Sequence, residues 1–524
     1  MANRDLQLLE SIKEYIKEEV PLFLEEVNIK EDRLLPHPLD KDIVEKLNDF
    51  DIREEDDDYR IFYYVKKIKE IWKLIIEKSI KCLRFFDGRE PFMINLKKQP
   101  IAYGVNELSE YFDKYTQFED MLYGGGKYYR DHVVHVFRVW LLGLDCLLDN
   151  KGEYLKRISI QEGVDVNSLE KISIWSMIAL THDLGYPLEK AQGIIEKTKD
   201  MMKSFISNPA LSLDLSFDGI QNNMNDFVVR FMSSKMHEVD MKCPKDDKTQ
   251  AIEKPYVARL QPKYYFKFQK SLERYNHGIL SAIIVYKLLI YFLESDFNIN
   301  EDYRFDKEES RQFYIRREIL RAVASHTCHD VYHLDMLNFG FLLIMADDAQ
   351  EWGRKRISEL YVKQSSNYEF DSITPSFDIK KGIYRTSNEE KEIDIHKFTI
   401  KEQFKFPKGE LENLKGILAS LIKQRNGYQE IFRDGQDTAK RNFIFEKKCD
   451  VVYDENKAVK FSISFTVSND AKPTFEIVVL SANKTAMTKT YADNFLKEVY
   501  EGYNINQINK SDDGIRYELI EQGE

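Results

Sequence analysis

Cysteine is scarce in this chain, which contains five among 524 residues. Their number is odd, and no two of them form a CxxC pair. This pattern argues against a disulfide framework and against a structural zinc module. A reducing compartment suits such a chain best, and we expect the protein to be cytoplasmic.

A long uninterrupted apolar segment is also missing. The longest candidate, Ile279 to Leu293, is broken by Lys287 and is too short to span a bilayer. The first ten residues, MANRDLQLLE, lack the apolar core of a secretion signal. We therefore expect a soluble protein that does not associate with membranes.

Positive charge is not in excess, because the formal net charge is -12. This balance gives no general attraction to nucleic acid or to anionic membranes, although it is compatible with a local basic groove. A small anionic substrate would need cations placed close to its site. No internal repeat is evident in the sequence.

The apolar residues that are present make up 43% of the chain, and the length suggests two or three domains. Residues 1–100 carry apolar side chains at gaps of three and four, which predicts amphipathic helices. Residues 101–360 contain long apolar-rich stretches that also predict helices. From 361 to 524, a polar and turn-rich segment leads into short alternating runs, which predict a smaller α+β domain.

We therefore expect a mainly α chain with a helical N-terminal region, a helical central domain and a C-terminal α+β domain. The last of these has no evident catalytic constellation. Formation of a homo-oligomer, regulation and gating of substrate are the roles open to it.

Histidine and aspartate form an ordered series inside the central region. Eight of the ten histidines fall between His132 and His333, and most lie in apolar surroundings. A buried imidazole is costly without a partner, and imidazole with carboxylate is a ligand mixture that transition metals accept. The sequence thus predicts a metal site, and its candidate ligands are His135, His182, Asp183, His277, His326 and Asp347.

Local patterns support this choice of ligands but leave alternatives. His182 and Asp183 end an apolar helical run, and we expect Gly185 beyond them to adopt the left-handed cap conformation. His132 and His135 are three apart and predict one buried helix face, the alternative being a pair of surface histidines. His277 opens an apolar helix, where a hydrogen-bonded core histidine is the alternative.

Three other residues compete with two of the chosen ligands. Asp348 directly follows Asp347, and His329 and His333 follow His326 at spacings of three and four. We favour His326 because it comes first after the apolar run ILRAVAS.

The motifs DHVVH, THDLGYP, YNHG, SHTCH and MADDAQ, in this order, resemble the HD-domain superfamily of metal-dependent phosphohydrolases, in its two-metal branch. The resemblance covers residues 101–360 and implies an HD-type helical bundle. It implies that one metal ion is held by His135, His182, Asp183 and Asp347, that Asp183 bridges, and that His277 and His326 hold a second ion. Mn, Fe, Co, Ni or Zn suits these ligands, and Mg is also compatible.

The chain departs from the family pattern in three places. Many members read HDxGK, whereas Tyr186 stands where their lysine would be, and Lys190 is the nearest substitute along the chain. Asp183 and His277 are 94 positions apart, which implies an insertion at about 198–270. Its segments 207–226 and 242–250 are loop-like in sequence, and the insertion is expected to act as a lid or a partner surface. His132 precedes its neighbouring ligand by three residues, where the cyclic-nucleotide phosphodiesterases have four, so its role as an acid is left open.

The resemblance implies hydrolysis of a phosphate ester or anhydride bond by a metal-activated hydroxide, with Asp183 central to catalysis. His132 or His329 is the candidate proton donor to the leaving oxygen. The expected substrate is small and phosphorylated, such as a nucleotide. Its candidate cationic contacts are Lys127, Arg130, Lys190, Arg274 and Arg354.

Three other functions share these motifs. A di-iron oxygenase of the HD superfamily uses the same order of ligands and is the strongest alternative. A nuclease acting on single-stranded nucleic acid is disfavoured by the acidic balance and by the lack of a basic, aromatic stripe. A degenerate module that only binds a nucleotide is disfavoured because every ligand type is present.

Overall fold

A computed structural model describes most of the helical part of the chain and the strands near its end. The described residues are 3–18, 37–57, 59–88, 104–125, 131–160, 164–204, 220–239, 255–294, 299, 302–328, 331, 336–350, 352–353, 369–385, 390–405, 420–421, 424, 427–428, 443–454, 459–468, 474–481, 503–511 and 514–521. The chain divides into two compact units, one formed by residues 2–331 and 337–354 and the other mainly by residues 355–524.

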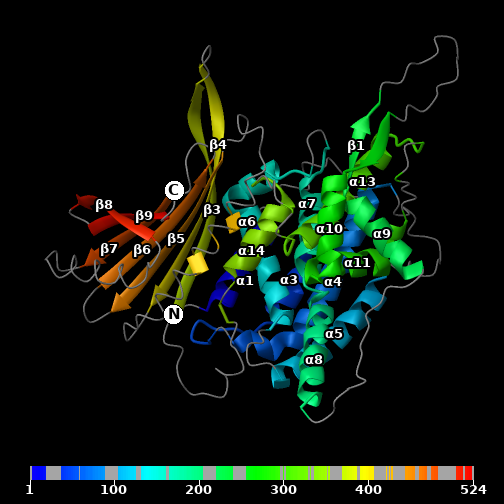
Figure 1. Ribbon diagram of the computed structural model, residues 1–524, viewed down its shortest axis with the longest axis horizontal. Helices are drawn as coiled ribbons and strands as arrows, with labels where there is room; N and C mark the ends of the chain where they lie inside the picture. The colour runs from blue at the N-terminus through cyan, green and yellow to red at the C-terminus, as the bar shows by residue number, and fades with distance from the viewer. Residues whose placement is uncertain are drawn as a thin grey trace. The chain divides into compact units, whose positions relative to one another are not determined.

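The first unit is built from helices (Figure 1). These are α1 (Arg4–Glu18), α3 (Lys41–Asn48), the 3-10 helix η1 (Arg60–Tyr64), α4 (Val65–Phe86), α5 (Val105–Gly125), α6 (Val133–Arg157), α7 (Ser168–Thr181), α8 (Tyr186–Met202), α9 (Ile220–Met232), α10 (Pro262–Glu273), α11 (His277–Leu288), α12 (Ile290–Leu293), α13 (Lys307–Ser325) and α14 (Phe339–Ala349). A short antiparallel hairpin, β1 (Ser234–Glu238) with β2 (Tyr256–Leu260), completes it. No helix in the described ranges is long and apolar enough to cross a membrane.

Helix α7 is buried along nearly its whole length and packs against α4, α6 and α13. Its apolar residues occupy all faces, as expected of a helix that is surrounded by others. Its neighbour α6 is tied to it by Trp140, whose Nε1 donates to Ser176 Oγ at 3.0 Å, and by Trp175, whose Nε1 donates to the Trp140 carbonyl at 3.1 Å. The helix ends immediately before His182 and Asp183, which are thereby held inside the unit.

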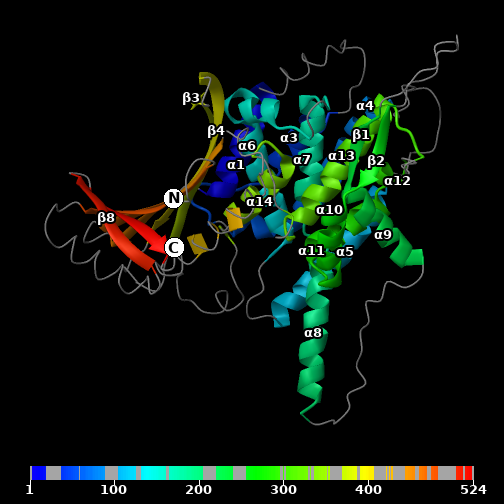
Figure 2. The same ribbon diagram turned by 45° about the horizontal axis from the view of Figure 1, so that its top comes forward.

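The insertion expected at about 198–270 contains regular structure. It spans the end of α8, then α9, the β1–β2 hairpin and most of α10. The expected loop at 207–226 is wrong from Ile220 onward, because α9 begins there and buries Val228 and Phe231 at helical spacing. The other loop-like segment, 242–250, lies outside the described residues. Figure 2 shows α8 extending beyond its neighbouring helices.

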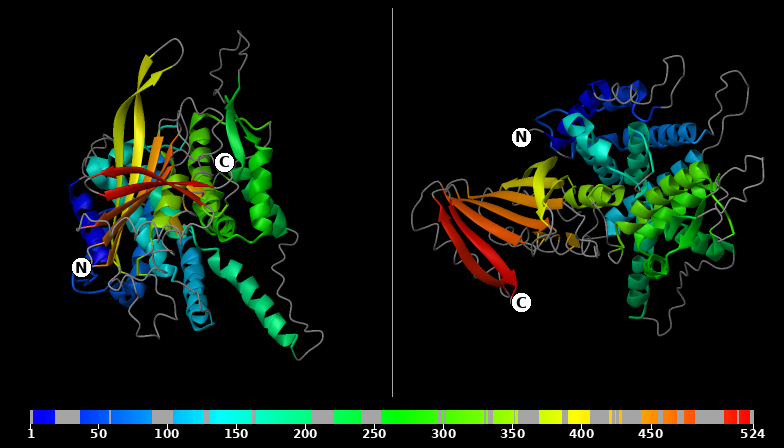
Figure 3. Two further views of the ribbon diagram at one scale, coloured as in Figure 1. Left: turned by 60° about the vertical axis from the view of Figure 1, so that its left-hand side comes forward. Right: turned by 90° about the horizontal axis from the view of Figure 1, so that it is seen from above.

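The second unit contains a seven-stranded sheet in the order β3-β4-β5-β6-β7-β9-β8 (Figure 3). Its strands are β3 (Glu369–Arg385), β4 (Glu390–Lys405), β5 (Phe443–Asp454), β6 (Val459–Ser468), β7 (Thr474–Ser481), β8 (Tyr503–Ser511) and β9 (Gly514–Glu521). Strands β4 and β5 are parallel, whereas the other neighbours are antiparallel. The expectation of a mainly helical chain with a sheet region near its C-terminus is confirmed.

The first two strands are longer than the short strands that the sequence predicts. β3 has 17 residues and β4 has 16, and the two pair along almost their full length. An antiparallel pair with one solvated face tolerates many polar residues, so the weak alternation of this segment concealed its regularity.

A buried ion pair fixes α1 to α6. Arg138 donates from Nε and Nη2 to the two carboxylate oxygens of Asp5, at 2.8 and 2.6 Å, and both side chains are fully buried. Trp352 Nε1 also donates to Asp5 Oδ1, at 3.0 Å. The first helix is therefore joined to the heart of the helical unit by charge as well as by apolar packing.

Replacement of Asp5 by alanine is expected to destabilise the protein by about 3–5 kcal/mol, because it leaves the Arg138 guanidinium buried without its counter-charge. Chemical denaturation followed by circular dichroism checks this value. Glu10→Ala, at an exposed position of the same helix, is the matched control and should change stability by less than about 0.5 kcal/mol. Equal losses for the two variants would contradict this role of the ion pair.

Candidate metal centre

The six predicted ligands converge because each lies at or near the end of a helix. His135 lies in the first turn of α6, and His277 is the first residue of α11. His182 and His326 are the C-terminal caps of α7 and α13, and Asp183 follows His182. The sixth, Asp347, lies in the last turn of α14. The helix interiors supply apolar packing, while their ends place polar side chains around one point.

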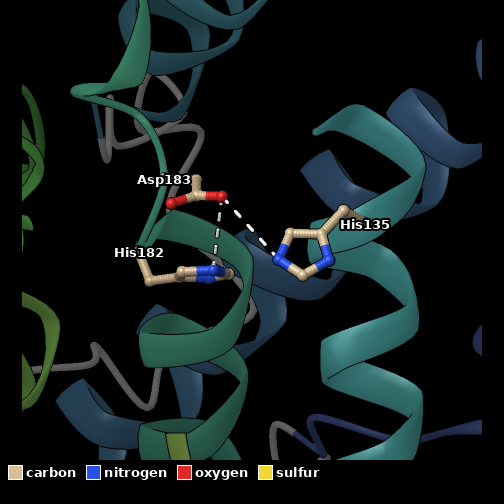
Figure 4. Close-up of side chains that lie close together, drawn as sticks. All are labelled: His135, His182 and Asp183. Atoms are coloured by element: carbon tan, nitrogen blue, oxygen red, sulfur yellow. Dashed lines mark ion pairs between the residues drawn. The ribbon is translucent and has the colours of Figure 1, made fainter. Parts of the chain in front are cut away.

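One oxygen of Asp183 faces the first pair of histidines. Its Oδ2 lies 3.8 Å from His135 Nε2 and 3.5 Å from His182 Nε2, as Figure 4 shows. Asp347 Oδ1 approaches the same two nitrogen atoms, at 2.8 Å and 3.8 Å. Two imidazoles and two carboxylates thus surround a common point.

The other oxygen of Asp183 faces the second pair. Its Oδ1 lies 3.2 Å from His277 Nε2 and 3.6 Å from His326 Nε2. Groups of three such ligand atoms, all within 4.8 Å of one another, occur on both sides of this carboxylate. Asp183 is therefore shared between two clusters, and each cluster is suited to hold a metal ion.

Every one of the four histidines is anchored through Nδ1. His182 Nδ1 lies 2.8 Å from the carbonyl of Ala179, and His326 Nδ1 lies 2.6 Å from the carbonyl of Val323. A carbonyl oxygen only accepts hydrogen bonds, so Nδ1 carries the proton and Nε2 presents a lone pair to the centre.

The other two histidines are anchored by side chains. His135 Nδ1 lies 2.5 Å from Gln350 Oε1, and the Gln350 amide nitrogen donates to the Trp352 carbonyl at 2.8 Å, which fixes the orientation of that amide. His277 Nδ1 lies 2.7 Å from Glu189 Oε2. Partners of this kind set the tautomer and the direction of metal-binding histidines in proteins.

The donor atoms of the centre are arranged so that they could hold a cation. Nε2 of His182 and Nε2 of His326 are buried, and neither has a hydrogen-bond partner among the described residues. Both lone pairs face carboxylate oxygens, an arrangement that repels unless a positive charge lies between them. These histidines and aspartates therefore fit a metal ion, and imidazole with carboxylate matches a transition metal better than calcium.

Electrostatics keeps both carboxylates ionised. Burial raises the pKa of Asp183, but the surrounding histidines outweigh burial and hold that pKa well below its usual value. Burial also raises the pKa of Asp347, but the hydrogen bond and charge of His135 and the charge of His182 bring it below its usual value. For His326, burial lowers the pKa and favours the neutral imidazole that a metal requires.

His132 caps the N-terminus of α6 and is buried. Its backbone nitrogen donates to Glu119 Oε1 at 2.6 Å, and its Nδ1 lies 3.4 Å from the same oxygen. Its ring stacks on that of Tyr186 with centroids 3.7 Å apart, and lies 6.2 Å from the ring of His135. The alternative of a surface histidine pair is therefore wrong.

Tyr186, at the position of the lysine in the HDxGK pattern, begins α8 and contacts both sides of the centre. Besides stacking on His132, its ring meets that of His277 edge to face at 5.5 Å. Helix α8 contains Pro187 in its first turn and carries Lys190 one turn beyond Tyr186. There Lys190 Nζ pairs with Glu189 Oε1 at 2.8 Å and lies 4.7 Å from the Tyr186 ring centroid.

Among the other predicted substrate contacts and the alternative proton donor His329, Arg274 is the one that the structure describes. Arg274 caps the C-terminus of α10, three residues before His277, with an exposed side chain. Lys127, Arg130, His329 and Arg354 lie outside the described residues.

Gly185 is not left-handed, contrary to the expectation for a C-terminal cap. Its φ and ψ are -79° and -11°, and it caps the N-terminus of α8 instead. Close packing explains the glycine, because a Cβ there would come within 2.3 Å of the carbonyl oxygen of His277. Absence of a side chain lets α11 approach the His182–Asp183 segment.

Three carboxylate or amide side chains beside the ligands were missed from the sequence. Gln350 lies one turn after Asp347, and that i, i+3 spacing was the available signal. Glu189 lies six residues after Asp183, but its contact with His277 joins residues 88 positions apart. No sequence pattern near Glu119 indicates that it lies beside the ligands.

No protein-family model, curated protein or solved structure matches this chain.

The metal-free protein should become less stable as the pH rises toward 10. Burial lowers the pKa of His277, but Asp183 and Glu189 outweigh burial and raise it from 6.5 to about 10. A folded-state pKa raised in this way gives stability that is complete below pH 6.5 and is lost as the pH rises through about 10. Thermal unfolding in the presence of a chelator measures this loss.

Glu189→Gln should reduce that pH-dependent loss, because it removes one of the two carboxylates that stabilise the His277 cation. Glu238→Gln, an exposed substitution on β1 with the same change of charge, is the control and should keep the wild-type dependence. Parallel curves for wild type and Glu189→Gln would show that Glu189 does not govern His277.

Proposed function

We propose that this protein is a metal-dependent phosphohydrolase of the HD type that holds two divalent metal ions. The observation that supports this best is the position of Asp183, whose two oxygens lie beside two different pairs of histidine nitrogens. A carboxylate shared in this way suits two cations a few ångström apart, the arrangement used for displacement at phosphorus.

The two ions would have different ligands. His135, His182, Asp183 and Asp347 would hold the first, and His277 and His326, with the second oxygen of Asp183, would hold the other. Mn, Fe, Co, Ni and Zn are the metals that suit such donors, with Mg also compatible. When bound, the ions would supply a nucleophile from water at neutral pH and would offset the charge of the phosphoryl group.

The side chains of the protein would orient the substrate and move the proton. His132 is beside the first cluster, and Glu119 lies 3.4 Å from its Nδ1, so His132 is a suitable proton donor to the leaving oxygen. Lys190, at the edge of the second cluster, is a candidate for contact with a phosphate. The substrate that suits the site is small and phosphorylated, such as a nucleotide.

Metal content tests the ligand assignment. We expect two ions in the wild-type protein, one in His277→Ala and fewer than one in Asp183→Ala, because Asp183 serves both clusters. Elemental analysis of the purified proteins by mass spectrometry measures these ratios. His237→Ala, at an exposed position on β1, is the control and should retain two ions. Unchanged metal content in Asp183→Ala would refute the centre.

Activity tests the reaction class. We expect the manganese- or cobalt-loaded protein to release phosphate or a nucleoside monophosphate from a panel of phosphate monoesters, diesters and nucleoside triphosphates. Asp183→Ala should lower kcat at least about 1,000-fold, since both clusters lose a ligand. Consumption of dioxygen by the iron-loaded protein, with no hydrolysis of any phosphate, would instead identify an oxygenase.

A further inference from the structure

One face of α5 runs along the side of the metal centre. Tyr111, Tyr115 and Glu119 are spaced at four residues, so they share that face. At one end, the Tyr111 hydroxyl donates to the carbonyl of Leu184 at 2.7 Å. At the other end, Glu119 accepts the hydrogen bond from the backbone of His132.

The middle residue of this face, Tyr115, therefore lies between contacts to both sides of the centre. Leu184 directly follows Asp183, and His132 precedes His135 by three residues. The Tyr115 side chain is 4% exposed, and its hydroxyl is buried without a hydrogen-bond partner among the described residues. Buried tyrosine hydroxyls usually have a partner, so this one calls for an explanation.

Packing accounts for the ring of Tyr115 but not for its hydroxyl. The ring stacks on Phe112 with centroids 5.7 Å apart, and Phe112 stacks on Trp72 at 4.5 Å. Trp72 in turn donates from Nε1 to the carbonyl of Leu180, the penultimate residue of α7. Phenylalanine would complete this stack equally well and would avoid the cost of a buried hydroxyl.

The hydroxyl stays protonated and is able to donate a hydrogen bond. Burial raises the pKa of Tyr115 well above its usual value, and the negative charges of Glu119, Asp183 and Asp131 raise it further. It therefore keeps its proton and is available to an acceptor that a ligand brings. An oxygen with negative charge is the strongest such acceptor.

We propose that the Tyr115 hydroxyl donates a hydrogen bond to a phosphoryl oxygen of the substrate held beside Asp183. This inference rests on the proposed phosphohydrolase function and adds a contact with the substrate that comes from outside the motifs that carry the metal ligands. Such a hydroxyl lowers the stability of the ligand-free protein and raises the affinity for the substrate.

Binding of inorganic phosphate to the manganese-loaded protein, measured by calorimetry, tests this contact. Tyr115→Phe should weaken phosphate binding about tenfold, the effect of losing one hydrogen bond to a charged group, with unchanged metal content. Its Tm without metal should be equal to or higher than that of the wild type, because the unsatisfied hydroxyl is removed.

Tyr111→Phe is the matched control on the same helix face. It loses a hydrogen bond to the backbone, so its Tm should fall while its affinity for phosphate stays that of the wild type. Wild-type phosphate affinity in Tyr115→Phe would overturn the proposal, and so would a fall in Tm as large as that of the control. If the metal-loaded wild type binds no phosphate, the phosphohydrolase function itself fails, and this contact fails with it.

Discussion

A buried negative charge, the Asp183 carboxylate, is the constraint to which the helical unit is adapted. A carboxylate at this depth is costly unless it is surrounded by positive charge and donors. Four imidazoles approach it, and two of them, His182 and His326, are held by the carbonyl three residues earlier in their own helix. Carbonyls in the last turn of a helix lack partners within it. The helix ends thus gain a hydrogen-bond donor, and the centre gains an oriented nitrogen.

Much of this site was predictable from the sequence, because its ligands occur where apolar helical runs end. A polar side chain at that place is either solvated or converges with others, and the series from His135 to Asp347 indicated convergence. The choice of His326 is compatible with the geometry, since its Nε2 lies 3.6 Å from Asp183. What the sequence did not reveal depends on contacts between distant segments. The roles of Glu189 and Tyr115 follow only from the packing of α8 on α11 and of α5 against α8 and α11.

The errors in the sequence reasoning have physical causes of the same kind. Gly185 was expected to adopt a left-handed backbone conformation. Instead, its lack of a side chain avoids a steric clash with the carbonyl oxygen of His277 on another helix. The expectation of a loop at 207–226 missed the start of α9, whose apolar residues pack on neighbouring helices. The length of β3 and β4 was underestimated because strands with a solvated face resemble turns in composition. Local propensity was therefore reliable for the buried helices and weak where tertiary contacts decide.

The ion pair between Arg138 and Asp5 has a consequence for the order of assembly. Arg138 also donates to the carbonyl of Trp352, which accepts from Gln350, and Gln350 in turn holds His135. This network joins Asp5 to Trp352, which are 347 positions apart, so it links the two ends of the helical unit. On a ribosome, α6 emerges long before the residues that orient its histidine. The centre would thus be completed only at the last stage of folding of this unit, and shorter nascent chains would lack an intact ligand set.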